Sequence, residues 1–177
     1  MSYFSYASGN EMIQRKKCSL SLILLLLVAI CSCSEQSGFT SYFTLGAEGM
    51  GTEPYVFELS DQLFESKPQN FFIRLRNDNS YAFTNIFLIC SLKSADEIVL
   101  QDTLEYAMAK SDGTWLGKGF TEVKESKLWW KEGIVIPKGT PLIVEISQAM
   151  RNSGNVEGIT ALEGIVSVGI SIEAQEE

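Results

Sequence analysis

The sequence contains no histidine among its 177 residues. Histidine is the usual general base of nucleophilic triads and the commonest metal ligand, so its absence removes the main route to both kinds of site. The phosphate-binding patterns GxxxxGK[ST] and strand-linked GxGxxG are also missing, and Gly113–Gly119 matches neither. We therefore predict a chain that is not an enzyme and that binds no cofactor or metal.

The remaining routes to chemistry depend on carboxylates. A pair of them could serve a glycosidase. The candidates for such a pair are Asp102, Glu105, Glu122 and Glu125. With 22 acidic residues in the chain, a suggestive pair carries little information. Calcium could bind loop carboxylates such as Asp96 and Glu97, although the DxDxDG pattern of a calcium loop is absent.

Long apolar runs are scarce as well. The main one, Leu20–Ile30, has 11 residues, whereas a spanning helix needs about 20. Arg15–Lys17 precede it and small residues follow it. This arrangement is typical of a secretory signal peptide, which we assign to residues 1–32. Met12 lies just before the basic cluster and is an alternative start.

The end of the signal peptide predicts a lipid anchor. Ile30-Cys31-Ser32-Cys33 fits a lipobox, in which an aliphatic residue stands three positions before the cysteine and a small residue directly before it. Cys33 follows serine, whereas Cys31 follows the bulkier isoleucine. We therefore predict lipid attachment at Cys33, with Cys31 as the alternative. A further alternative is an ordinary signal peptide in which the cysteines are incidental.

Removal of residues 1–32 changes the cysteine count and the charge. Of four cysteines, two leave, Cys33 is acylated and only Cys90 remains, so no intramolecular disulfide can form. Cys90 lies in an apolar run and is predicted to be a buried small hydrophobe. The processed chain has 11 basic and 21 acidic residues. Such a surface disfavours nucleic acid and anionic head groups, so membrane attachment must come from the lipid.

The rest of the chain is predicted to form one all-β domain. Residues 33–38 are the lipidated cysteine and a tether that spans at most about 20 Å, and residues 39–177 form the domain. Apolar residues alternate with other residues in several short segments, which is typical of strands with one buried face. These segments are Phe39–Leu45, Tyr55–Leu59, Phe71–Leu75, Ile98–Tyr106, Leu142–Ile146 and Val166–Ile172. Breaker-rich turns between them favour a single antiparallel β-sandwich, jelly-roll-like. We expect one or two short helices, at Glu122–Lys131 and Ser147–Asn152.

Two segments are candidate partner contacts. Phe83–Leu92 is apolar on both faces, so Phe87 and Ile89 must be covered by the protein itself or by a partner. The tryptophans are Trp115, Trp129 and Trp130. Two adjacent tryptophans in an extended segment point to opposite faces, so one of them is expected at the surface. It could cover the core edge, anchor an interface or stack on a sugar.

In this context the chain resembles the gliding-motility lipoprotein GldH family, over about Phe71 to Glu173. The resemblance rests on the order of several short motifs together with the lipobox. They are Arg76-Asn77, Tyr81, Asn85-Ile86-Phe87, Leu104-Glu105-Tyr106, Met108-Ala109, Gly113–Gly119, Glu125-Ser126, Ile146–Arg151, Leu162–Ile165 and Val168–Ile170.

The resemblance implies a lipid-anchored, non-enzymatic component of the bacterial gliding apparatus, linked to type IX secretion and acting as a structural or assembly subunit. Its partners would be the membrane, through the lipid, and other envelope proteins of that machinery. Ser34, rather than aspartate, after the lipidated cysteine favours the outer membrane. The alternative function is a surface glycan-binding lipoprotein of a polysaccharide uptake system, which predicts tryptophans arranged as a platform.

Overall fold

The computed structural model describes residues 38–59, 67–95, 97–135, 141–152, 154 and 157–175. They lie in one compact unit, Ser37–Glu177. The predicted signal peptide, Cys33, the tether before Gly38, and Asp96 lie outside the described residues. Within the described part, no helix has the length and apolar character needed to cross a membrane.

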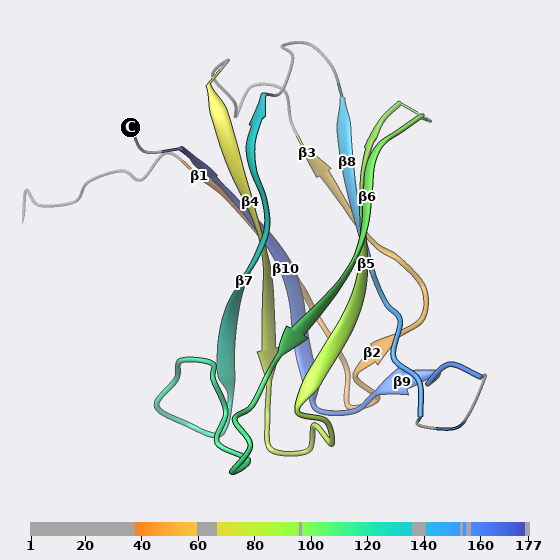
Figure 1. The fold of residues 1–177 in the computed structure, drawn as a ribbon, viewed down its shortest axis with the longest axis vertical. Helices are drawn as coiled ribbons and strands as arrows, with labels where there is room; N and C mark the ends of the chain where they lie inside the picture. The colour runs from red at the N-terminus through yellow and green to blue at the C-terminus, as the bar shows by residue number, and fades with distance from the viewer. Residues whose placement is uncertain are drawn as a thin grey trace, which may run out of the picture. The chain divides into compact units, whose positions relative to one another are not determined.

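Two antiparallel four-stranded sheets form the domain (Figure 1). The first sheet has the order β1-β10-β4-β7, and the second has the order β3-β8-β5-β6. The strands of the first sheet are β1 (Gly38–Thr44), β10 (Ile165–Ala174), β4 (Pro68–Asn77) and β7 (Lys124–Val135). Those of the second are β3 (Tyr55–Leu59), β8 (Leu142–Gln148), β5 (Asn85–Ser94) and β6 (Glu97–Ala107). A small third sheet pairs β2 (Met50–Gly51) with β9 (Ala161–Leu162).

The strand order confirms the jelly-roll-like β-sandwich. Counting only the eight strands of the two large sheets, the first sheet holds the first, eighth, third and sixth in chain order, and the second holds the second, seventh, fourth and fifth. Two interlocked Greek keys produce this alternation between sheets. Most long connections therefore cross from one layer to the other at the two ends of the strands.

The core lies between the two sheets and follows the alternation of each strand. In β4 the side chains of Phe71, Ile73 and Leu75 are buried, while the residues between them remain partly exposed. The inward residues of β5, β8 and β10 complete the same cluster. Cys90 is among them, as predicted, and burial together with the charge of Asp102 raises the pKa of its thiol.

Both predicted helices are wrong. Glu122–Lys131 falls largely in β7, and Ser147–Asn152 covers the end of β8 and the irregular chain after it. In β7, Ser126, Leu128 and Trp130 point inward, while Lys127 and Trp129 point outward and are exposed. The alternation of inward and outward residues was present in the sequence. The Glu, Lys and Ser residues of the segment obscure it, because they are not apolar and because Glu and Lys are good helix formers. Helix propensity is a weak prior that pairing with β4 overrides.

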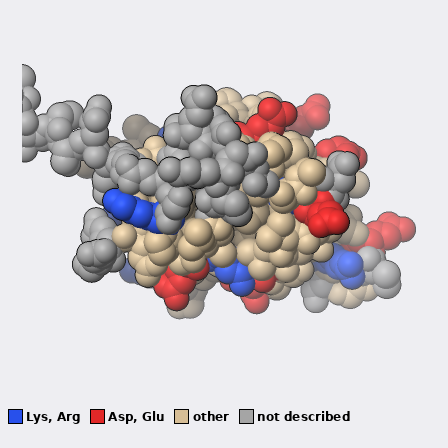
Figure 2. Space-filling view, turned by 90° about the horizontal axis from the view of Figure 1, so that it is seen from above, with Lys and Arg blue, Asp and Glu red and all other residues tan. Residues whose placement is uncertain are grey.

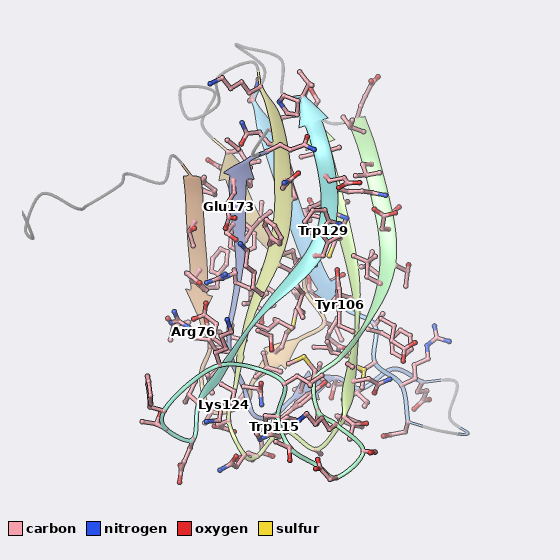
Figure 3. All side chains as sticks on the ribbon, turned by 60° about the vertical axis from the view of Figure 1, so that its left-hand side comes forward. Arg76, Tyr106, Trp115, Lys124, Trp129 and Glu173 are labelled. Atoms are coloured by element: carbon pink, nitrogen blue, oxygen red, sulfur yellow. The ribbon has the colours of Figure 1, made fainter. Side chains whose placement is uncertain are left out.

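Side chains connect the two sheets along β6 and β7. The Trp130 indole donates from Nε1 to Asp102 Oδ2 at 3.0 Å, and Lys131 Nζ lies 3.3 Å from the same oxygen. The Tyr106 hydroxyl donates to the Trp129 carbonyl; both residues are labelled in Figure 3. Polar bonds therefore close the sandwich on this side.

Candidate functional site

Four separate parts of the chain meet at one end of the sandwich. They are the described residues of 45–54, 78–84, 108–123 and 149–164, with β2 and β9 among them (Figure 1). We call this the distal end, because β1 begins at Gly38 at the opposite end of the strands. Since β10 is antiparallel to β1, the described chain also ends there. Figure 2 looks onto that opposite end, where acidic and basic side chains are interspersed on the described surface.

A tight turn shapes the hairpin at the centre of the distal end. Gly113 has a φ of 84°, and the amide of Thr114 donates to Asp112 Oδ1 at 2.9 Å. The same hydrogen bond holds the pKa of Asp112 below its ordinary value. Ser111-Asp112-Gly113 therefore forms a turn in which aspartate is the cap and glycine takes the positive φ, as these residue types favour.

After this hairpin the chain changes its pairing partner. The amide of Leu116 donates to the Met108 carbonyl, which keeps it in the hairpin. Two residues later, Lys118 exchanges two backbone hydrogen bonds of 2.8 Å with Glu125 of β7. A Cβ at Gly117 would come within 3.0 Å of the Glu125 carbonyl oxygen. A residue without a side chain therefore suits the point where the chain crosses to β7.

A charged cluster lies on the outer face of the first sheet beside the distal end. Arg74 Nη2 binds Glu125 Oε1, and Arg76 Nε donates to Glu125 Oε2 at 2.8 Å. The Tyr42 hydroxyl donates to Glu125 Oε1 and accepts from Arg74 Nε, both at 3.1 Å. The Arg76 guanidinium also lies 4.5 Å from the centre of the Tyr42 ring. One carboxylate therefore joins β1, β4 and β7.

The partners of Glu125 determine its charge. Burial by itself would raise the pKa of this carboxyl, but the hydrogen bond from Arg76 and the positive charge of Arg74 outweigh it, so the pKa lies below the ordinary 4.5. The pKa of Arg74 is raised: burial opposes the rise, but the interactions with Tyr42 and Glu125 outweigh it. The pKa of Arg76 is also raised, chiefly by its hydrogen bond to Glu125. The cluster is thus ionised at neutral pH.

We expect Glu125→Gln to remove part of the acid dependence of stability. A depressed carboxyl pKa stabilises the fold above the unfolded pKa, near 4.5, and this contribution is lost as pH falls through the lower folded pKa. Because the pair is partly solvent-screened, the contribution is about 1 kcal/mol at pH 7. Urea unfolding at pH 7 and pH 3.5 measures it. The variant should be less stable than wild type at pH 7 and closer to it at pH 3.5. An equal loss of stability at both pH values would contradict a lowered pKa for Glu125.

A groove runs beside β7 at the distal end. It encloses about 700 Å³ and is lined by Lys127 and Leu128 of β7, Leu116 and Lys118 of the preceding loop, Ala107 and Arg74, among others. This volume falls within the roughly 300–1,000 Å³ typical of ligand clefts. A smaller hollow of about 460 Å³ lies against β5, where its lining includes Phe83, Phe87 and Met150.

The candidate contact residues of β5 lie on the outer face of the second sheet. Phe87 and Ile89 are both partly exposed, and Phe87 lines the smaller hollow. The Phe87 amide lies 3.2 Å from Met150 Sδ, so the chain after β8 covers part of this strand. The two apolar faces predicted for this strand are therefore present.

The three tryptophans occupy three different environments. Trp130 is 4% exposed and packs edge-on against Phe71 with ring centres 5.8 Å apart, whereas Trp129 is 47% exposed and packs against Phe72 at 5.0 Å. The prediction that adjacent tryptophans face opposite sides is confirmed. Trp115 is half-buried at the distal end, where its Nε1 donates to Asn79 Oδ1 at 3.1 Å (Figure 3). The rings do not form a common platform.

The sequence reasoning missed the apolar tip of the distal end. Phe120 is fully exposed, and Leu116 and Val123 of the same loop are also exposed. Lys124 braces this loop, since its Nζ donates to the carbonyls of Gly119 and Thr121 at 2.7 and 2.8 Å. The available signal was an aromatic residue in a glycine-rich turn, where no core position can hold it.

Three of the four candidate catalytic carboxylates are engaged separately, and the fourth, Glu122, is exposed in the loop before β7. Asp102 binds Trp130 and Lys131, Glu105 accepts from Asn85 at 2.7 Å, and Glu125 binds two arginines. Across the described ranges, no three His, Cys, Asp or Glu side chains gather as a metal site would require. Glu97, the described half of the proposed calcium pair, is exposed at the start of β6.

Comparison with known families is decisive. Residues 52–172 match the model of the GldH lipoprotein family. The chain belongs to the GldH lipoprotein family. It is 39% identical over 162 residues to the gliding motility lipoprotein GldH homolog of Christiangramia forsetii, covering 92% of this chain and 99% of that protein. It is 40% identical over 155 residues to the gliding motility lipoprotein GldH of Flavobacterium johnsoniae, covering 88% and 96%.

Solved structures add no functional information. The VP2 subviral particle of infectious bursal disease virus matches with 15% identity over 82% of this chain and 34% of that chain, at a TM-score of 0.30, which is too low to support an argument. The GldH assignment confirms the resemblance predicted from the sequence. This GldH-family chain is a gliding-motility lipoprotein, and its lipoprotein nature makes it a membrane-associated protein of the cell envelope.

Proposed function

We propose that this GldH-family lipoprotein is a non-enzymatic assembly subunit of the gliding machinery, linked to type IX secretion, and that its distal end binds an envelope partner. The observation that carries the proposal is the fully exposed Phe120, with exposed Leu116 and Val123, at the end of the domain away from Gly38. An apolar cluster of this kind at a strand end is typical of a protein interaction site.

Anchoring gives this arrangement a mechanical meaning. Acylation at Cys33 holds Gly38 within about 20 Å of the bilayer surface. The ten-residue strands β4 and β10 then carry the distal end about 33 Å further. A lipid anchor raises the local concentration of this end toward other membrane-bound proteins, so no single contact needs high affinity. We place the anchor in the outer membrane, as Ser34 favours.

Several observations support a binding role over a catalytic one. Three of the four candidate carboxylates, Asp102, Glu105 and Glu125, serve separate structural bonds, and the only described cysteine is a buried thiol with a raised pKa. A glycan platform finds no support, because Trp115, Trp129 and Trp130 lie in different environments. Phe87, Ile89, Trp115 and Trp129 remain candidate contact positions, whereas Trp130 supports the core from within.

The experiment is affinity purification of the full-length acylated protein from detergent-solubilised membranes, with mass spectrometry of the proteins that accompany it. Phe120→Glu should reduce recovery of gliding or type IX secretion proteins about tenfold, the equivalent of one anchor residue. Val99→Glu is the matched control, since Val99 is also an exposed apolar residue but lies at the opposite end of the strands.

Three results would decide between the readings. Val99→Glu should recover the same proteins as wild type, and Cys33→Ala should lose both the membrane fraction and the partners. Recovery of an outer-membrane carbohydrate transporter by wild type would replace gliding with the glycan-binding alternative. Equal loss in the Phe120 and Val99 variants would show that the distal end is not the contact surface.

A further inference from the structure

The backbone of β7 is partly unpaired on the side away from β4. In an antiparallel pair, residues alternate between those that exchange hydrogen bonds with the neighbour and those that point away from it. The backbone amide and carbonyl of Glu125 both bond to Lys118, so these two groups are directed away from β4. The backbone amide and carbonyl of Lys127, two residues further along β7, must therefore also be directed away from β4. The Trp129 carbonyl follows the same alternation, since it accepts a hydrogen bond from Tyr106 rather than from β4.

The protein covers this edge on both sides of Lys127 but not at it. Lys118 pairs with β7 at Glu125, and then Leu116 turns away to pair with Met108. Where Leu116 would stand if the strand had continued, the groove of about 700 Å³ opens. Among the described residues, no backbone hydrogen bond is made to the outward amide and carbonyl of Lys127.

The lining of the groove favours an acidic occupant. Arg74, Lys118 and Lys127 supply three cations and Glu125 one carboxylate, in a chain whose net charge is −8. Glu125 and Glu173 already bind Arg74 and Lys127 respectively, which leaves Lys118 with its charge unpaired among the described residues. Leu116 and Leu128 add apolar surface on either side.

The cationic lining favours an occupant from another protein over a second copy of this surface. Lys127 lies level with Gly169 of β10 and Tyr42 of β1, so the ends of the described chain, Gln175 and Gly38, stand six and four residues further along the strands. A second copy of this surface would bring like charges together, which costs free energy. An edge that presents an amide, a carbonyl and lysines suits the addition of a partner strand.

We propose that β7 binds an extended, acidic segment of a partner protein by strand addition at Lys127. This inference rests on the proposed function and specifies how the distal end makes its contact. The partner segment takes the place that the chain vacates at Gly117, exchanges two backbone hydrogen bonds with Lys127, and directs carboxylates toward Lys118.

The test compares Lys127→Pro with Lys127→Thr. Both variants lose the ion pair with Glu173 and the contact of Lys127 Nζ with the Phe72 ring, but only proline removes the outward amide. Because that amide does not bond to β4, proline is tolerated there as it is on the solvent side of edge strands. Circular dichroism and thermal unfolding verify that both variants fold.

The probe is a synthetic heptapeptide that alternates valine and glutamate, with fluorescence anisotropy as the readout. Wild type and Lys127→Thr should bind it within about threefold of each other, and Lys127→Pro at least about tenfold more weakly. The same peptide with N-methylated backbone amides, or with lysine in place of glutamate, should bind at least about tenfold more weakly to wild type. Equal binding by the two variants, or by the acidic and basic peptides, overturns strand addition.

Purified complexes separate this inference from the proposed function. If Lys127→Pro and Lys127→Thr recover the same envelope proteins, the distal end binds its partner elsewhere and strand addition is wrong. If wild type itself recovers no gliding or secretion protein, the proposed function fails, whatever the peptide result.

Discussion

Gly164→Ala is expected to destabilise the domain severely. Gly164 has a φ of 83°, and a Cβ at this position would lie 2.1 Å from the backbone nitrogen of Tyr81 and 2.6 Å from the carbonyl carbon of Ser80. Backbone atoms cannot move aside as the end of a long side chain can. The loop before β10 and the loop after β4 would have to separate, and these are the loops that the Asp78 amide joins to the Gly164 carbonyl at 2.9 Å.

Gly113→Ala provides the matched control for this substitution. Gly113 has nearly the same φ, 84°, but nothing lies within 4 Å of its hypothetical Cβ. Its cost is the left-handed conformation alone, about 1–2 kcal/mol. Urea unfolding should show a modestly weakened Gly113→Ala protein, whereas Gly164→Ala should lose more than about 4 kcal/mol, a loss typical of severe core defects. Similar losses in both would mean that conformation rather than crowding governs Gly164.

The second large effect is expected from Trp130→Ala. The ring of Trp130 is buried against Phe71, and its Nε1 is hydrogen-bonded to Asp102. Removal leaves a cavity and takes the indole donor from the partly buried Asp102 carboxylate, which keeps only Lys131. We expect a loss of about 3–5 kcal/mol in the free energy of unfolding, which thermal or urea unfolding would measure.

The neighbouring Trp129→Ala tests the same chemistry on the opposite face. Trp129 loses its edge-on contact with Phe72 but stands at the surface, so the expected cost is below about 1.5 kcal/mol. Its effect should appear in partner recovery if the outer face of β7 contributes to binding. Loss of stability in Trp129→Ala equal to that in Trp130→Ala would contradict the strand orientation.

The sequence was sufficient for the architecture where the large apolar side chains of a strand lie mostly on one face. In β8 and β10 apolar side chains recur at every second position, and these strands lie where the alternation predicts them. It failed at β7, where solvent-facing Lys127 and Trp129 alternate with inward Ser126 and Trp130. Neither set is uniformly apolar or polar there, so only the pairing with β4 establishes the strand.

The candidate site was harder to predict because its contacts are distant in sequence. Tyr42 and Glu125 are 83 positions apart, and Arg74 and Glu125 are 51 apart. No local spacing relates them. The Ser111-Asp112-Gly113 turn was predictable, since its hydrogen bond is local, whereas the exposure of Phe120 depends on how the loop before β7 leaves the sheet.

The path by which the chain enters the sandwich determines how it carries mechanical force. A pull between the bilayer and a partner at the distal end would act along β1, which begins at Gly38 and pairs with β10 through seven antiparallel register positions. Such a force shears the two strands past each other, so the hydrogen bonds between them resist together instead of opening one at a time from the end. A domain pulled at Gly38 and at its distal end would therefore resist tension along these two strands as one unit.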